Sequence, residues 1–246
     1  MAYIDSPIFP DIIYEDFYPP DDNDPEAIYA QYDQLRKKCP LAYTSQNGGY
    51  WTLTRYDDVK QAASDTNTFI SSVKAVIPSD PRGTRRPPLN TDPPVHTPYR
   101  TALDRTLKPS RIKRLDGILD MHAEREFAKL LKQGSGDICM QFTAKFAAWV
   151  EVTWLNLADE TAPLLANTAA AWVHAWREQR KDEVMFHSNR LYDIARALFA
   201  DRKRRPRNPE EDPASSLLLE KGPDGVPLTE EQLVSVLKFL FLLSRM

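Results

Sequence analysis

The segment 90–115, NTDPPVHTPYRTALDRTLKPSRIKRL, places an imidazole and a guanidinium four residues apart, at His96 and Arg100. If a helix opens at Pro93 or Pro94, as proline in a first helical turn allows, residues i and i+4 share one face of that helix. Both side chains then offer nitrogen donors to a single anion, and a carboxylate suits them well. The spacing therefore predicts an anion site near the start of this helix.

Two other interpretations of the pair remain open from the spacing alone. A helix that begins with Thr97 as its N-cap and Pro98 as its first residue would leave His96 outside it, and the helix would not fix the direction of that side chain. A histidine and an arginine near a helix start are also commonly solvated or bonded to a local acid, which here would be Asp92 or Asp104.

The run as a whole resembles a known family. Its pattern, Asp-Pro-Pro-x-His-Thr-x-x-Arg followed by a helix and the turn Lys-Pro-Ser at 108–110, is similar to the C-helix region of the cytochrome P-450 haem-thiolate monooxygenases. In that family the histidine and the arginine hold a haem propionate, so the resemblance implies this cofactor-binding role for His96 and Arg100. The family usually has phenylalanine at the position of Leu107.

The chain before this run predicts a helix, a hairpin and a second helix. An amphipathic pattern covers 25–38, and the segments 41–44 and 50–54 alternate and are rich in aromatic and β-branched residues. Between these strands, 45–49 supplies residues that tolerate positive φ. Asp57 is the expected cap of the next helix. This order resembles the small sheet and the B helix of the same family.

The segment 71–89 has four prolines and a glycine, too many breakers for a long helix and too few polar residues for a free linker. We expect an ordered loop. In the resembled family this stretch wraps over the substrate, which implies substrate-binding roles for Val76 and Ile77. Simple packing of the loop onto the body of the protein is the alternative.

Four further segments show apolar residues near the helical period: 111–132, 140–157, 163–180 and 182–203. The first is followed by a glycine stop at 134–136, and Cys139, just before the second, is expected to be a small buried hydrophobe. In the family, helices at the place of the last two form the roof of the active site. The pattern predicts a mainly α fold with a small antiparallel β-sheet, an α+β class.

Composition excludes several functions. The net charge of −3 and the pI near 5.9 recruit neither nucleic acid nor an anionic membrane surface. Cys39 and Cys139 are far apart and form no metal or disulfide framework, which indicates a reducing compartment. The start of the chain has no basic region followed by an apolar core and no Arg-rich amphipathic pattern, so we expect a soluble, cytoplasmic protein without a membrane anchor.

One basic cluster, at 201–207, contains five cations without interleaved aromatic residues. The acids Glu210, Glu211 and Asp212 follow it closely, so a solvated loop that neutralises itself is expected rather than a nucleic-acid site. The surrounding sequence also resembles the arginine-rich end of helix G in the family and the turn and leucines after it.

Near the C-terminal end, Thr229 and Gln232 have the spacing of a capping box, which predicts a helix start. The helix it opens is almost wholly apolar around Lys238, too short to span a bilayer but apolar enough to require burial on every side. It resembles the first half of the long I helix. The family's acid-threonine pair of that helix is not reached, and its Glu-x-x-Arg motif and cysteine loop do not occur in the 246 residues.

The resemblance therefore covers the chain from about Ile28 onward and is to the N-terminal half of a soluble cytochrome P-450. It implies an extended arm at 1–24 and a partial domain at 25–246, with the small sheet and the B and C helices in 25–110 and a helical body in 111–246. The complete protein would use haem, O2 and electrons from a reductase or ferredoxin to oxygenate a lipophilic small molecule. Without the thiolate ligand, this chain alone is expected to be inactive. A non-catalytic helical protein that binds a partner or a small ligand is the alternative.

Overall fold

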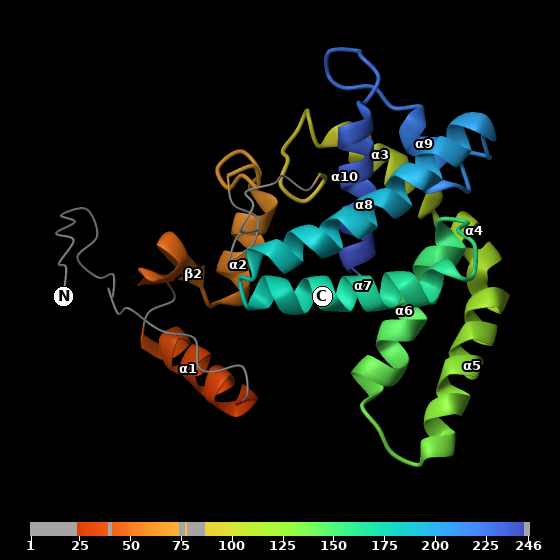
Figure 1. Ribbon diagram of the computed structural model, residues 1–246. Helices are drawn as coiled ribbons and strands as arrows, with labels where there is room; N and C mark the ends of the chain where they lie inside the picture. Colours follow the sequence, from red (N-terminus) through yellow and green to blue (C-terminus); the bar gives the residue numbers. More distant parts are fainter. Residues whose placement is uncertain (1–23, 39–40, 74–76, 78–86, 244–246) are drawn as a thin grey trace. The chain divides into compact units, whose positions relative to one another are not determined.

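The computed structural model describes residues 24–38, 41–73, 77 and 87–243. They form two compact units, 1–70 and 71–246, which are described separately. The elements, labelled as in Figure 1, are α1 (Pro25–Lys38), β1 (Leu41–Thr44), η1 (Gln46–Gly48), β2 (Tyr50–Leu53), α2 (Tyr56–Ser64), α3 (Thr97–Thr106), α4 (Pro109–Ile112), η2 (Lys113–Leu115), α5 (Asp116–Gln133), η3 (Cys139–Thr143), α6 (Ala144–Trp154), α7 (Thr161–Arg177), α8 (Lys181–Arg204), α9 (Pro213–Leu218) and α10 (Glu230–Leu243). The predicted mainly α fold with a small antiparallel sheet is confirmed.

The first unit contains the predicted hairpin. Strands β1 and β2 pair antiparallel with Leu41 opposite Leu53, and the turn between them uses positive φ at Asn47, Gly48 and Gly49. These are residue types that adopt this backbone region at little cost, which is why the turn could be predicted. At position 49 the positive φ favours glycine, and a Cβ there would also force the Tyr43 side chain to shift.

Helix α2 of the first unit begins two residues earlier than the cap prediction requires. Arg55 is the N-cap, with the extended conformation φ −96° and ψ 141°, so Asp57 lies inside the first turn and the prediction that Asp57 is the cap is wrong. The carboxylates of Asp57 and Asp58 still favour the helix, because the N-terminal end of a helix dipole carries partial positive charge.

The core of the second unit is formed by α7, α8 and α10. Helices α7 and α8 run side by side as an antiparallel pair, and α10 packs against both (Figure 1). Its centre is Trp172, which is fully buried and whose Nε1 donates a hydrogen bond to Ser188 Oγ at 2.7 Å. Leu191 and Phe199 of α8 and Phe241 of α10 are buried in the same cluster.

Helix α10 begins at the predicted capping box. The Thr229 N–H donates to Gln232 Oε1 at 2.8 Å, and the Gln232 N–H donates to Thr229 Oγ1 at 3.3 Å. Lys238, midway along the helix, is fully buried, with Nζ 4.9 Å from the centre of the Trp172 ring and 5.2 Å from that of Tyr192. This buried cation therefore makes cation–π contacts with two aromatic rings in the core.

Helices α5 and α6 lie side by side in the second unit (Figure 1). The single helix predicted from residue 111 is instead split into α4, η2 and α5, because the chain tightens into a 3-10 turn that buries Leu115. Gly134 ends α5 in the left-handed region, with φ 77°, and its N–H donates to the Leu131 carbonyl, as the glycine stop predicts.

Two residues in this unit differ from their predicted environments. Cys139 is exposed, because it begins the π-helical turn η3, where its N–H is bonded to Asp137 Oδ1 at 2.8 Å at the edge of the helical body. Arg202, expected in a solvated loop, is buried near the end of α8 with its Nε 3.1 Å from Asp212 Oδ1. Its Nη2 donates to the carbonyls of Leu155 and Asn156.

Candidate haem-propionate site

The candidate site lies at the start of α3. His96 is the N-cap residue with helical dihedral angles, φ −63° and ψ −37°, and the Arg100 N–H donates to the His96 carbonyl at 3.2 Å. The two residues are therefore one helical turn apart, as their spacing predicted. The predicted starts are both wrong, since the helix opens neither at Pro93 or Pro94 nor with Thr97 as its N-cap. Separate turns occupy the segment before the helix, because the N–H groups of His96 and Thr97 donate to the carbonyls of Asp92 and Pro94 at 3.0 and 3.3 Å.

The buried face of α3 packs against other parts of the second unit. Tyr99, Ala102 and Leu103 are buried, and α3 packs against α9. Arg105 reaches from α3 to donate to Ser216 Oγ and to Glu220 Oε1, each at 2.7 Å. These contacts, which the sequence did not predict, fix the direction in which the first turn of α3 presents its side chains.

Asp92 connects the start of α3 to the preceding segment. Its carboxylate accepts the backbone N–H of Ser71 at 2.8 Å and that of Ser72 at 2.9 Å. Hydrogen bonding from Ser72 and then Ser71, with a contribution from the charge of His96, holds the pKa of Asp92 below its ordinary value of 3.8. The role of Asp92 was missed, because nothing in the local sequence points to a partner twenty residues away.

Arg100 pairs with the local acid that the sequence offered as an alternative. Its Nε lies 2.9 Å from Asp104 Oδ1, one turn further along the helix, and both side chains are more than half exposed. Exposed pairs of this kind contribute only about 0–1 kcal/mol to stability. A ligand carboxylate can therefore replace Asp104 at Arg100 at small energetic cost, and the guanidinium has further N–H donors to offer.

The nitrogen donors of His96 and Arg100 fit the carboxylates of a haem. His96 is partly exposed and Arg100 exposed, so both are accessible to a ligand. The resemblance also implies an axial cysteine thiolate. Cys139 is exposed on η3, and Cys39 lies outside the described residues. Within residues 24–38, 41–73, 77 and 87–243, no cluster of three His, Cys, Asp or Glu side chains could hold a metal ion.

The structure describes only one of the two predicted substrate-binding residues. Val76 lies outside the described residues. Ile77 is described and is exposed. The structure therefore places His96 and Arg100 one helical turn apart and describes only Ile77 of the predicted substrate-binding pair.

Known proteins that are similar to this chain indicate its class of protein. The solved structure of PksS, a cytochrome P450 of the bacillaene polyketide synthase of Bacillus subtilis 168, matches with a TM-score of 0.76 at 23% identity, over 93% of this chain and 58% of that one. The steroid C26-monooxygenase of Mycobacterium tuberculosis is 30% identical over 48% of this chain and 33% of that protein. Cytochrome P450 109 of Bacillus spizizenii is 25% identical over 82% of this chain and 49% of that protein. No family model matches the chain.

The fold is thus that of the N-terminal portion of a haem-thiolate monooxygenase. The chain belongs to the cytochrome P-450 family. It spans between a third and about half of the length of the curated relatives that it matches. None of the helices among the described residues has the length and apolar character needed to cross a membrane.

Proposed function

We propose that this chain forms the N-terminal part of a cytochrome P-450 that inserts one atom of O2 into a lipophilic small molecule. The shared fold and the relatives named as monooxygenases support the proposal. In it, residues 25–246 belong to one partial domain that follows an arm at 1–24. The chain alone is inactive, and the complete protein acts in the cytoplasm with electrons from a reductase or ferredoxin.

In this function His96 and Arg100 hold a haem propionate. The observation that carries this role is their placement one turn apart on an anchored helix, with donors that are accessible to a ligand. A bound haem with a cysteine thiolate supplies the redox chemistry that activates O2. The contribution of this chain is to orient the haem through charge-assisted hydrogen bonds to its carboxylates.

The segment 71–89 helps to choose the substrate in the same proposal, through Val76 and Ile77. Its attachment by Asp92 to the start of α3 supports this role, because the segment begins close to the propionate site. The steroid substrate in the name of one relative suits an apolar lining of this kind.

The test begins with the transcript. We expect the reading frame or an alternative splice to continue past the codon for Met246 and to encode the acid-threonine pair, the Glu-x-x-Arg motif and the cysteine loop. A stop at that codon in every transcript would remove the enzyme function from this chain.

The second step measures haem affinity in the protein encoded by the continued frame. The double variant His96→Ala with Arg100→Ala should lose on the order of 2 to 6 kcal/mol of haem binding, because two charge-assisted donors disappear. The matched control, His174→Ala with Arg177→Ala, removes the same residue types from α7, where His174 is well exposed. Unchanged haem affinity in the first variant would show that the pair does not bind the propionate.

The exposed apolar side chains of α5 favour a second candidate function, a non-catalytic protein that binds a partner or a small ligand. Met121 and Leu131 are both more than half exposed. A partner protein would cover such residues. If the chain of 246 residues is monodisperse, binds no haem and retains its fold, this second function is favoured over the first.

A further inference from the structure

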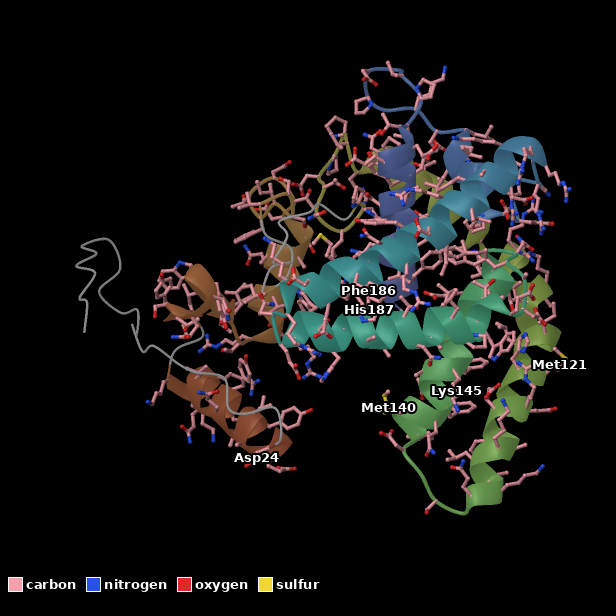
Figure 2. All side chains as sticks on the ribbon, in the orientation of Figure 1. Asp24, Met121, Met140, Lys145, Phe186 and His187 are labelled. Atoms are coloured by element: carbon pink, nitrogen blue, oxygen red, sulfur yellow. The ribbon has the colours of Figure 1, made fainter. Side chains whose placement is uncertain are left out.

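The most deeply buried side chains of α5 are polar. Among the described residues of α5, the buried side chains are His122 and Glu126, each 2% exposed, while the apolar Met121 lies on the outer side of the helix (Figure 2). The ring of His122 stacks on that of Trp149 of α6, with centroids 4.3 Å apart and planes at 14°. A titratable ring therefore forms a central part of the contact between the two helices.

The protonation state of His122 is fixed by its neighbour. Nη2 of Arg125 lies 3.0 Å from Nδ1 of His122. Because a guanidinium can only donate hydrogen bonds, Nδ1 must be an acceptor, and the imidazole is neutral with its proton on Nε2. The same guanidinium lies 4.1 Å from the Trp149 ring, so Arg125 and His122 both contact one indole.

Glu126 fixes the indole from the other direction. Its carboxylate accepts from Lys129 Nζ at 2.8 Å and from Trp149 Nε1 at 3.2 Å. The charged groups that act on His122 are Arg125 and Glu126 on α5 and Asp159 in the segment after α6. Burial and the charge of Arg125 lower the pKa of His122, and Asp159 and Glu126 oppose that shift only in part.

We propose that His122 makes the contact between α5 and α6 sensitive to pH. A proton taken up at Nδ1 breaks its hydrogen bond to Arg125, which is also on α5, and repulsion between the two cations displaces the guanidinium from the Trp149 ring of α6 and loosens the two helices. The step adds one proton from solvent and changes no covalent bond between heavy atoms. The imidazolium would lie beside the Arg125 guanidinium, and two adjacent cations repel. The inference does not depend on haem or on the proposed enzyme activity.

The direction of the pH dependence follows from linkage. His122 has a pKa in the folded protein below its ordinary value of 6.5, so between these two values the unfolded chain binds more protons than the folded one. The contribution of His122 to the free energy of unfolding is therefore fully present above pH 6.5. It declines as the pH falls from 6.5 towards the pKa of His122 in the folded protein. The α5–α6 contact loosens when His122 itself takes up the proton, at the lower end of the window.

Tryptophan emission of the 246-residue chain tests the proposal, because protonation of His122 and loosening of α5 both change the surroundings of the Trp149 indole. Emission should change reversibly with a midpoint below pH 6.5. This component should disappear in His122→Gln, which keeps a side-chain acceptor for Arg125 but does not titrate, and in Trp149→Phe. A titration that persists in His122→Gln, or is absent from the unmodified chain, overturns the proposal. His122→Asn serves as the second non-titrating variant if His122→Gln does not fold.

Amide hydrogen exchange distinguishes loosening of one contact from general unfolding. After correction for the intrinsic pH dependence of exchange, α5 should lose protection below the midpoint while α7 and α8 keep theirs. In His122→Gln, the protection of α5 should be independent of pH. Equal loss of protection in α5, α7 and α8 would contradict a local device.

Discussion

The helices α7, α8 and α10 and the helix pair α5 and α6 belong to one compact unit but are held together by different chemistry. The first group surrounds Trp172 mainly with aliphatic and aromatic side chains, and Ser188 and Lys238 also contact the indole. The second presents buried His122 and Glu126 to Trp149 and leaves apolar residues of α5 exposed. Apolar contact is insensitive to pH, whereas a polar contact depends on the charge of each group.

The comparison teaches that helical periodicity locates a helix but does not identify its buried face. On α10 the buried side chains among those described are apolar except for Lys238. On α5 the apolar residues Met121 and Leu131 are exposed, and buried polar groups are tolerated because each has a partner. The four predictions below separate the two regions, beginning with the largest expected effect.

Trp172→Ala should produce the largest loss, about 3–5 kcal/mol of the free energy of unfolding, because it empties the centre of the apolar group and removes an aromatic partner of Lys238. Urea denaturation measures the change. The matched variant Trp149→Ala acts on the half-buried indole of the other region and should cost less. Equal losses at both positions would show that the two regions do not differ.

Asp212→Asn should cost about 3 kcal/mol, because it removes the fully buried carboxylate of the Arg202 pair and leaves that buried guanidinium with only the partly exposed carboxylate of Asp201. Its control is Asp193→Asn, which breaks the exposed pair between Asp193 and Arg196 and should cost less than about 1 kcal/mol. Thermal unfolding of both variants measures the two losses of stability. Similar costs would mean that burial does not set the strength of these pairs.

Glu126→Gln should cost about 2 kcal/mol at neutral pH, because hydrogen bonds to a charged group are lost in the α5–α6 contact. Burial raises the pKa of Glu126, but Lys129, Trp149 and Arg125 outweigh it, and the net pKa lies below 4.5. The carboxylate therefore contributes stability above pH 4.5 that is lost as the pH falls below this value. Urea midpoints between pH 3 and pH 7 should show this decline in the unmodified chain and a weaker one in Glu126→Gln.

Leu131→Gln should have the smallest effect, within about 0.5 kcal/mol, because this leucine on α5 is 64% exposed. Leu191→Gln, the same change in the fully buried leucine of α8, should destabilise by several times more. Chemical denaturation compares the two. A large cost at Leu131 would indicate that this face of α5 is covered in solution.

Much of the fold was predictable where the determinants are local. The hairpin turn follows from residues that accept positive φ at 47–49, the end of α5 from Gly134, and the start of α10 from the reciprocal bonds of Thr229 and Gln232. Local patterns failed where distant partners decide. Arg202 is buried because Asp212 and the carbonyl of Leu155 receive it, which a basic run in the sequence does not reveal.

The candidate site likewise has features that the local sequence predicts and features that depend on distant residues. The spacing of His96 and Arg100 predicted that they lie one turn apart, and they do, although the helix begins at neither expected place. The anchoring of α3 by Arg105 joins residues more than a hundred positions apart and has no local signature. The binding of a propionate stays a prediction, since it depends on a ligand and not on the chain alone.

The carboxylate of Asp92 has a consequence for sequence variation among related chains. Ser71 contributes only its backbone N–H, so the side chain at 71 can change without loss of that bond unless it becomes proline, whereas Ser72 interacts with the carboxylate through both its backbone N–H and its side chain. Position 92 has no such freedom, because an amide offers one oxygen where the carboxylate offers two. Natural selection should therefore tolerate drift at 71 while it preserves a hydroxyl side chain at 72 and an aspartate at 92.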